Sequence, residues 1–340
     1  MSHLEIFSQQ MIPAVEREMK SVLGLDEWGD GLFYGMMHYH LGWVDGQLQR
    51  VSGNGGKHIR PVLCLLVCAS AGGDWQQAVP AGAAIELIHN FTLIHDDIQD
   101  DSPTRRGRPT VWRLWGVPQA INSGDSMFAA AHLALHRLIA RGVRPEIVSQ
   151  AFYDLANTCL KLTYGQYQDM SFETRPAVTV DEYIEMITGK TAVLISLCAQ
   201  LGALIAGQAK ETVEHYASFG RDLGLAFQVK DDILGIWGDE AAIGKSAATD
   251  IATRKKSLPV SYGLANSPEL RELYTRPGND PDFVPQVIHW LDHYQARQFA
   301  EEYANHYSQS ALDYLAAARP GGPGALALQE LTNTLLNRQA

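Results

Sequence analysis

Apolar residues recur every three or four positions along most of the chain, which is the spacing of amphipathic α-helices. The pattern predicts helices at 8–23, 32–49, 60–72, 76–99, 119–141, 147–170, 181–187, 191–207, 210–237, 283–318 and 325–337. Turn-forming stretches such as SGNGG and RPGGPG separate these segments. A weakly apolar segment, 266–282, predicts a surface loop or short helices. We therefore expect an all-α fold, with one domain over 1–340 built as a bundle of long helices.

Composition narrows the class of protein. The chain has 340 residues, 46% of them hydrophobic and 19% charged, which is ample material for a globular core. Its formal net charge of −11 favours no nucleic-acid partner, because phosphates require a broad basic face. The longest apolar segment, 191–207, is short for a membrane span, and the N-terminus does not resemble a signal peptide. Four cysteines lie among apolar residues, as core thiols do. We expect a cytoplasmic protein without stable membrane insertion.

An acidic cluster ends one predicted helix. In FTLIHDDIQDDSPTRRG (91–107), four aspartates fall within six residues. Like charges four apart on a helix repel each other, so the cluster favours a bound cation, and Mg²⁺ prefers oxygen ligands. Asp96 and Asp100 share a helix face and are candidate metal ligands. Asp97 points to the side of the helix, so we expect it to support these ligands without binding the metal directly.

A second acidic pair ends another helix, in FQVKDDILGIWGD (227–239). Asp231 is the candidate ligand, and Gly235 stands where a second carboxylate would complete a same-face pair. We expect Asp231 to act with Asp232 or Asp239 through bridging water. Two helices that both end in DD could direct their acidic ends into one cavity.

Tight basic groups accompany the acidic motifs. Lys57 and Arg60 follow a Gly-Gly turn at the start of a helix, where a phosphate is favoured, and Arg105 with Arg106 can grip phosphate oxygens. A further group is RKK (254–256). Together they predict two anion sites beside a metal cluster, and diphosphate oxygens would complete the metal coordination.

Two other motif interpretations are weaker. A calcium loop starting at Asp96 would lack the glycine at its sixth position and the glutamate at its twelfth, where Gly107 stands. A metal-dependent phosphohydrolase with a His95–Asp96 pair would need further histidine ligands; His89 is available, but the RRG segment and the second DD helix would go unexplained.

Seven sequence blocks resemble the trans-isoprenyl diphosphate synthases (polyprenyl synthetases), in the right order and over nearly the whole chain: GGKHIRP, ELIHNFTLIHDDIQDDSPTRRGRPTVW, GVPQAINSGDSMF, GKTA, FQVKDDILGIWGD, GKSAATDI and RKKSLP. The resemblance implies the isoprenoid synthase fold, with a central apolar cavity. It implies head-to-tail condensation of isopentenyl diphosphate with an allylic diphosphate (dimethylallyl, geranyl or farnesyl), three Mg²⁺ ions in each active site, and a homodimer.

The same resemblance assigns roles position by position. It implies that the Mg²⁺ ligands are Asp96, Asp100 and Asp231. The allylic diphosphate would be held by Arg105, Lys190, Lys245 and Lys255, and isopentenyl diphosphate by Lys57, Arg60, His89 and Arg106. Thr191 and Gln228 would flank the reacting carbons, and the departing diphosphate would accept the proton. Gly235 departs from the family's usual DDxxD and leaves the outer shell of the third metal open.

Product length is expected to depend on Thr92 and Phe91, four and five residues before Asp96. A small residue followed by a deeper aromatic resembles many C20 synthases, so we expect geranylgeranyl diphosphate, with farnesyl diphosphate as the alternative. A class I terpene cyclase would ionise the same substrate but has little use for Lys57, Arg60 and His89. A non-catalytic regulatory subunit should have lost the first aspartates or arginines, which this chain keeps.

Overall fold

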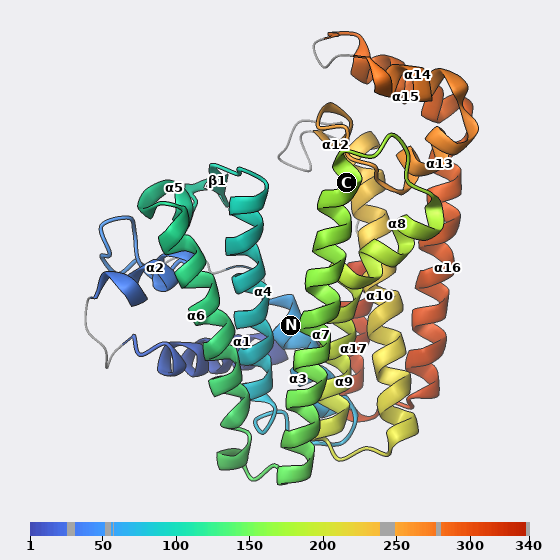
Figure 1. Cartoon of the computed structure of the whole chain (residues 1–340). Coiled ribbons are helices and arrows are strands. Elements are labelled where there is room, and N and C mark those ends of the chain that lie inside the picture. Colours follow the sequence, from blue (N-terminus) through green and yellow to red (C-terminus); the bar gives the residue numbers. More distant parts are fainter. Residues whose placement is uncertain (26–30, 52–55, 57, 239–248, 277–279, 338–340) are drawn as a thin grey trace. The chain divides into compact units, whose positions relative to one another are not determined.

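The computed structural model describes residues 1–25, 31–51, 56, 58–238, 249–276 and 280–337 (Figure 1). The chain divides into two compact units. The first contains 1–155, 198–210 and 320–328, and the second contains 156–197, 211–319 and 329–340. Among the described residues, four helices contribute to both units: α7 (Pro145–Glu173), α9 (Val193–Ile205), α10 (Lys210–Trp237), through Lys210 alone, and α17 (Gly322–Leu336). The expectation of a single domain stays a prediction.

The first unit is built around two long helices, α4 and α6, which lie side by side (Figure 1). Helices α1 and α3 pack against α4. The elements of this unit before α7 are α1 (His3–Val22), α2 (Leu32–His40), α3 (Ile59–Ser70), α4 (Val79–Gln99), β1 (Thr104–Arg105), β2 (Arg108–Pro109), α5 (Val111–Trp115), α6 (Val117–His136) and the 3₁₀-helix η1 (Ile139–Arg141). The start of α1 is fixed by a capping box between Ser2 and Glu5.

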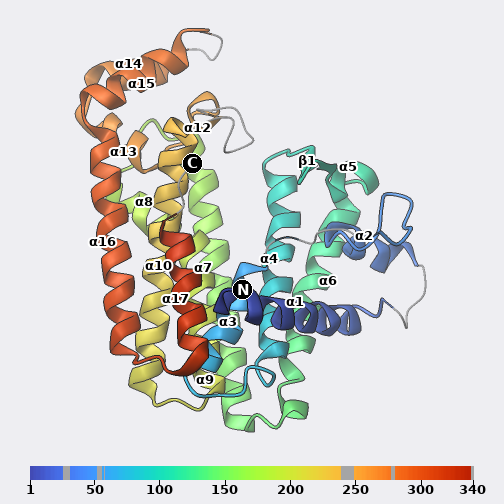
Figure 2. The ribbon, with the colours of Figure 1, turned by 180° about the vertical axis from the view of Figure 1, so that it is seen from behind.

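The remaining elements are α7 (Pro145–Glu173), α8 (Val180–Ile187), the π-helix η2 (Thr188–Ala192), α9 (Val193–Ile205), α10 (Lys210–Trp237), α12 (Thr249–Ala252), α13 (Leu258–Asn266), α14 (Pro268–Thr275), α15 (Phe283–His293), α16 (Ala296–Ala317) and α17 (Gly322–Leu336). In the second unit, α10 and α16 run alongside each other (Figure 2). A core formed by α7, α8, α10 and α16 holds them together, with Tyr183, Val229 and Ala300 fully buried. This core anchors the helix that carries the second acidic pair.

Most predicted helices are confirmed, and α10 has the predicted bounds. The prediction of one helix over 32–49 is wrong, because α2 ends at His40. The side chain of Asp45 accepts backbone hydrogen bonds from Gln47 and Gln49, each at 2.9 Å, so a turn replaces the helix. Similarly, the predicted helix over 283–318 is two helices, because Gln295 adopts a left-handed conformation with φ 58°.

Among the described residues, one helical run, Val180–Ile205, is long and apolar enough to cross a membrane by length and composition. Of its most apolar window, 56% is buried inside the structure. A core helix of a globular protein meets the same criterion, so the run is weak evidence for a membrane segment.

Candidate functional site

The first acidic motif lies at the C-terminal end of α4. The backbone N–H of Asp100 donates to the carbonyl of Asp96 at 2.8 Å, so the last turn keeps the two carboxylates on one side of the helix. Asp101 then adopts φ 49° and the chain leaves the helix. Asp96 is half-buried and Asp100 is exposed. These two oxygen donors are therefore placed as the sequence predicts.

Asp97 takes the supporting position expected for it. Its side chain is buried, and its Oδ1 accepts a hydrogen bond from Arg105 Nε at 2.8 Å. Burial raises the pKa of Asp97, while the Arg105 guanidinium acts in the opposite direction. Its second oxygen, Oδ2, is buried without a hydrogen-bond partner. The ion pair between Asp97 and Arg105 holds the basic segment, 105–108, next to the C-terminal end of α4.

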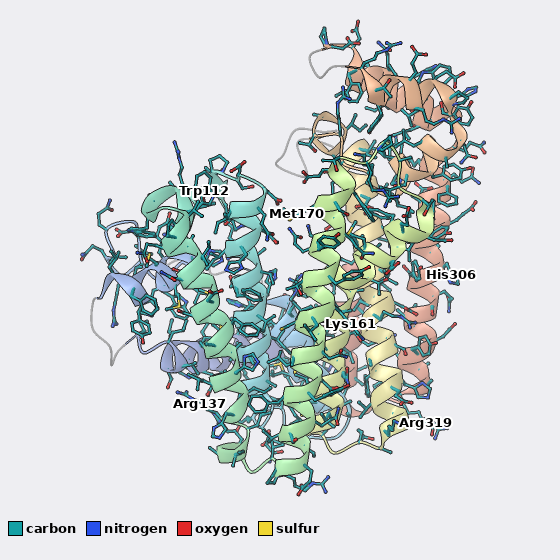
Figure 3. All side chains as sticks on the ribbon, in the orientation of Figure 1. Trp112, Arg137, Lys161, Met170, His306 and Arg319 are labelled. Carbon is teal, nitrogen blue, oxygen red and sulfur yellow. The ribbon has the colours of Figure 1, made fainter. Side chains whose placement is uncertain are left out.

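The basic segment is a short hairpin that the hydrophobic pattern did not predict. Strands β1 and β2 pair antiparallel, with Arg105 opposite Arg108. The turn residues Arg106 and Gly107 both have positive φ, 52° and 74°, as in type I′ turns. The carbonyl of Ser102, before the hairpin, accepts a hydrogen bond at 2.9 Å from Nε1 of Trp112, the residue labelled in Figure 3. These contacts fix the direction of the consecutive arginines.

Arg60, on α3, contacts His89, the histidine predicted for the isopentenyl diphosphate site. Its Nη1 lies 3.2 Å from His89 Nε2. Burial, followed by the charges of Arg60 and Arg106, lowers the pKa of His89 well below its ordinary value. Burial, followed by the charges of Arg106 and Arg105, lowers the pKa of His40 to about 3. Both imidazoles are therefore neutral and leave the positive charge to the arginines.

A cavity of about 660 Å³ opens beside the hairpin within the first unit. Its polar lining includes Asp97, Arg105, Arg106 and His40. The sequence did not single out His40, which comes from the end of α2; its only signal was a histidine within an aromatic stretch. A cavity lined by guanidinium groups and neutral imidazole suits an anionic ligand.

The two residues expected to control product length lie on α4. Phe91 is only 9% exposed, and its ring meets that of Phe128, on α6, edge to face with centroids 5.4 Å apart. Thr92 is half-buried, and its hydroxyl donates to the carbonyl of His89 at 2.8 Å. Bulky Phe91 and small Thr92 are therefore consecutive on α4, and the ring of Phe128 packs against the ring of Phe91.

In the second unit, the two aspartates of the second motif have different environments. Asp231 is half-buried, whereas Asp232 is 1% exposed. The carboxylate of Asp232 accepts hydrogen bonds from the Tyr183 hydroxyl, from Gln228 Nε2 at 3.1 Å and from the backbone N–H of Leu258 at 3.3 Å. The expectation that Asp232 acts with Asp231 through bridging water is therefore wrong, because buried donors already occupy its oxygens.

Gln228 and Thr191, which the resemblance places beside the reacting carbons, contact each other. The Thr191 hydroxyl donates to Gln228 Oε1 at 2.9 Å, and the amide of Gln228 is oriented by Asp232. A chain of hydrogen bonds, Tyr183–Asp232–Gln228–Thr191, therefore connects α8, α10 and the π-helix, and it runs from the core to half-buried positions. Such a chain holds the Thr191 hydroxyl in one orientation.

Lys190 lies on the π-helix and pairs with Asp169 of α7. Close backbone packing fixes this position, since a methyl group added at Gly165 would come 2.3 Å from the backbone nitrogen of Lys190. π-Helical turns are frequent at functional sites. Asp169 is a candidate functional residue that the sequence reasoning missed; its signal is the spacing of Gly165 and Asp169 on one helix face.

The position of Gly235 is filled from another helix. A methyl group added at Gly235 would come 2.8 Å from Asp250 Oδ2. Asp250, on α12, was not predicted as a site residue. Lys255 follows α12 and is exposed, and its backbone N–H donates to the Asp250 carbonyl at 2.9 Å. Lys57, Lys245 and Asp239 lie outside the described residues.

The donor set suits Mg²⁺. The candidate ligands are carboxylates, which hard divalent cations prefer, and Asp97 Oδ2 is a buried oxygen with no hydrogen-bond partner. Among the described residues, no group of three or more His, Cys, Asp or Glu side chains is arranged to hold a metal ion by itself. Mg²⁺ held by few carboxylates takes its other ligands from water and phosphate oxygens.

Comparison with known proteins identifies the family. The polyprenyl synthetase family model matches residues 42–291. A geranylgeranyl diphosphate synthase of Mycobacterium tuberculosis is 44% identical over 247 residues, covering 71% of this chain and 69% of that protein. A (2E,6E)-farnesyl diphosphate synthase of Mycobacterium bovis is 35% identical over 314 residues, covering 90% and 86%. The crystal structure of a geranylgeranyl pyrophosphate synthetase from Pyrococcus horikoshii is similar with a TM-score of 0.87, 31% identity and coverage of 99% and 98%.

The chain belongs to the polyprenyl synthetase family, with the all-α isoprenoid synthase fold, and is a prenyl-transferring enzyme. The family and the all-α fold expected from the sequence are confirmed. The roles assigned to individual residues stay predictions.

Proposed function

We propose that the enzyme condenses isopentenyl diphosphate with an allylic diphosphate in a Mg²⁺-dependent reaction whose main product is geranylgeranyl diphosphate. The family match and the M. tuberculosis relative support the reaction class. The position of Phe91 carries the assignment of chain length. We further propose that the enzyme works in the cytoplasm, without stable insertion in a membrane.

Different residues bind the diphosphate groups of the two substrates. Arg60, Arg106 and His89 bind the diphosphate of isopentenyl diphosphate. Because His89 is neutral, its ring can donate or accept a hydrogen bond without adding a charge. Arg105, Lys190 and Lys255 bind the allylic diphosphate. Asp96, Asp100 and Asp231 hold Mg²⁺, of which the reaction uses three ions. When bound, Mg²⁺ stabilises the negative charge that develops on the departing diphosphate.

The bond-making step needs orientation more than proton transfer by the protein. The allylic C–O bond breaks, the alkene of isopentenyl diphosphate attacks the allylic carbon, and the departed diphosphate accepts the proton that is lost. Thr191 and Gln228 flank these carbons, and their hydrogen-bond chain to Asp232 fixes their dipoles before the charge develops. Apolar walls exclude water from the cation.

Asp250 supplies the carboxylate that the second acidic motif lacks. Its Oδ2 lies where a side chain at position 235 would begin, one helical turn beyond Asp231. An oxygen donor there restores the charge of a DDxxD motif. We assign it to the surroundings of the Mg²⁺ ion held by Asp231.

The product is set by the depth of the apolar space along α4. Thr92 lets the growing prenyl chain pass, and the buried ring of Phe91, backed by Phe128, ends the space. Mass spectrometry of products from isopentenyl diphosphate with C5, C10 and C15 starters tests this assignment. We expect a C20 product from each starter. A main product of C15 would instead support the farnesyl diphosphate alternative, to which the M. bovis relative points.

A terpene cyclase is the other alternative. The Arg60–His89 pair argues for a second diphosphate substrate, which a cyclase does not bind. Incubation with an allylic diphosphate alone separates the two activities, because a cyclase releases a hydrocarbon or an alcohol. We expect almost no such product without isopentenyl diphosphate.

A homodimer is proposed from an exposed apolar stripe on α7. Leu160, Tyr164 and Tyr167 are 72%, 54% and 66% exposed and share one helix face. Met170, labelled in Figure 3, follows them on α7 and is 39% exposed. Exposed patches of this kind mark association surfaces. Light scattering should give twice the chain mass of 37.4 kDa. Leu160→Glu with Tyr167→Glu should reduce it to the monomer.

A further inference from the structure

The ring of His95 contacts the ring of Phe91, one helical turn earlier on α4. The two rings meet edge to face, with centroids 5.2 Å apart and an interplanar angle of 79°. Phe91 also meets Phe128 of α6 edge to face, with centroids 5.4 Å apart and an angle of 65°. His95 and Phe128, from two different helices, therefore hold the buried Phe91 ring in one orientation.

The ring of His95 lies directly on the backbone of α6 at Gly124. A methyl group added at Gly124 would come 2.3 Å from His95 Nε2 and 2.4 Å from its Cδ2, and the third nearest atom also belongs to this ring. Gly124 is buried within a helix that runs alongside α4 (Figure 1). Alanine is the more favourable residue inside a helix, so the space that the His95 ring needs explains the glycine.

Two oxygen atoms of α6 face the same nitrogen of the His95 ring. Nε2 lies 3.5 Å from the Ile121 carbonyl oxygen and 3.6 Å from Asp125 Oδ1. Both neighbours accept hydrogen bonds, so Nε2 carries the hydrogen. The Asp125 side chain is 67% exposed, and solvent therefore weakens its contact with the ring. Packing against Gly124 and Phe91 is what mainly holds the ring in place.

We propose that His95, packed on Gly124, is a specificity-determining positioning residue for the length of the prenyl product. The edge of its ring holds the Phe91 ring in the orientation that ends the space for the growing chain. His95 acts through Phe91 and does not itself bound that space. The inference rests on the proposed function, in which Phe91 is the floor of the space.

The orientation of Phe91 matters because an aromatic ring blocks a channel only while it lies across it. A long or aromatic side chain on a helix has two accessible χ1 orientations, so an unsupported ring can exchange between them. An edge-to-face aromatic contact favours one arrangement by about 2- to 10-fold. Without the His95 ring, Phe91 should leave the blocking orientation part of the time, and part of the product should gain a C5 unit.

Substitutions of His95 separate its ring from its hydrogen bond. His95→Gln keeps a donor without a ring, His95→Phe keeps a ring without a donor, and the exposed His136→Gln is the matched control. In mass spectra taken at equal conversion, His95→Gln should raise the ratio of longer products to the main wild-type product by about 2- to 10-fold. His95→Phe should keep the wild-type ratio. A merely structural role would lower stability and rate in His95→Gln but leave the ratio unchanged.

Gly124 gives a second test, because the effect of a side chain there should depend on the ring. Gly124→Ala should displace the ring, lengthen the products and lower the melting temperature. In a His95→Ala background the added methyl group has space, since the three nearest atoms all belong to the ring. There Gly124→Ala should change neither the products nor the melting temperature further. Gly321→Ala, where a methyl group meets nothing within 4 Å, is the control.

Phe91→Ala, measured in parallel, separates this inference from the proposed function. If Phe91→Ala lengthens the product while His95→Gln keeps the wild-type ratio, the role of His95 is overturned and the floor stands. The role is also overturned if His95→Phe lengthens the product as much as His95→Gln does, or if Gly124→Ala acts equally with and without the ring. If Phe91→Ala leaves the product unchanged, or the wild type makes no prenyl product, the proposed function fails and the role of His95 fails with it.

Discussion

The carboxylate of Asp250 lies against Gly235, so closely that a methyl group at Gly235 would come 2.8 Å from Asp250 Oδ2. The Asp250 carboxylate therefore occupies space that a side chain at position 235 of the DDxxG motif would need. At the position where this chain departs from the family pattern, a carboxylate from another helix lies against the glycine.

This arrangement predicts a compensation between the two positions. Asp250→Asn should lower kcat/KM about tenfold or more and raise the Mg²⁺ concentration needed for half-maximal rate, because an oxygen donor's charge is lost near the metal. Gly235→Asp in the Asp250→Asn background should recover part of the loss. Alone, Gly235→Asp should be harmful, since it sets two carboxylates against each other. Full activity of Asp250→Asn would contradict the compensation.

Loss of either ligand in the first motif should abolish turnover. Asp96→Ala or Asp100→Ala removes a carboxylate from the helix end without opening the core, so the fold should persist. The expected loss in rate is about 10³-fold or more, the scale of a missing direct metal ligand. Circular dichroism checks the fold, and the exposed Asp313→Ala is the control. If either variant kept more than about a tenth of the wild-type rate, that result would contradict the assignment of the replaced aspartate as a metal ligand.

The two basic groups should serve different substrates. Arg60→Ala should mainly raise KM for isopentenyl diphosphate, because it also strips the partner from His89. Lys190→Ala should mainly impair the allylic substrate, and Asp169→Asn should do so more weakly, because Asp169 only orients the ammonium group. Kinetics with each substrate varied in turn measure both effects. Equal effects of Arg60→Ala and Lys190→Ala on both substrates would refute the division.

Tyr183→Phe should destabilise the second unit in a pH-dependent way. Burial raises the pKa of Asp232 to about 6 from 3.8, so its stabilising contribution is fully present below pH 3.8 and is lost as the pH rises to about 6. Without the Tyr183 hydroxyl the charged carboxylate loses a donor, which should cost about 1–3 kcal/mol at about pH 8 and less at about pH 4. Urea unfolding at both pH values measures this difference. Tyr303→Phe, which lies at the same core, should show no such pH dependence.

The sequence predicted those parts of the fold and site that depend on local pattern. Heptad-like apolar spacing located α10, and the i, i+4 relation placed Asp96 with Asp100, since both follow from helix geometry. The end of α2 at His40 was missed because a side chain, Asp45, competes for the backbone donors of the following turn.

Contacts between distant segments could not be read from the pattern. The different roles of Asp231 and Asp232 depend on Tyr183 and Leu258, which lie 49 and 26 residues from Asp232. Asp250 beside Gly235 and Asp169 beside Lys190 likewise arise only when separate helices pack. Adjacent identical residues in one motif have the same local signal, and tertiary packing alone leaves Asp231 half-buried and places Asp232 in the core.

The last prediction concerns product length, and the structure sharpens it. The ring of Phe91 is buried and meets Phe128 with centroids 5.4 Å apart. Under the proposal, these two aromatic side chains together form the floor of the prenyl-chain space beyond Thr92. Phe91→Ala should lengthen the main product by at least one C5 unit. Because Phe128 still blocks part of the space, Phe91→Ala with Phe128→Ala should lengthen it further.

Thr92→Phe should act in the opposite direction and shorten the product, because it moves the aromatic barrier about 1.5 Å along the helix toward Asp96. Phe→Ala changes in a core cost about 3–5 kcal/mol, so product spectra should be taken below the melting temperature of each variant. The exposed Phe33→Ala serves as the control. If mass spectra of the products are the same for Phe91→Ala, Thr92→Phe and wild type, Phe91 packs between helices without bounding the prenyl chain, and the C20 assignment loses its basis.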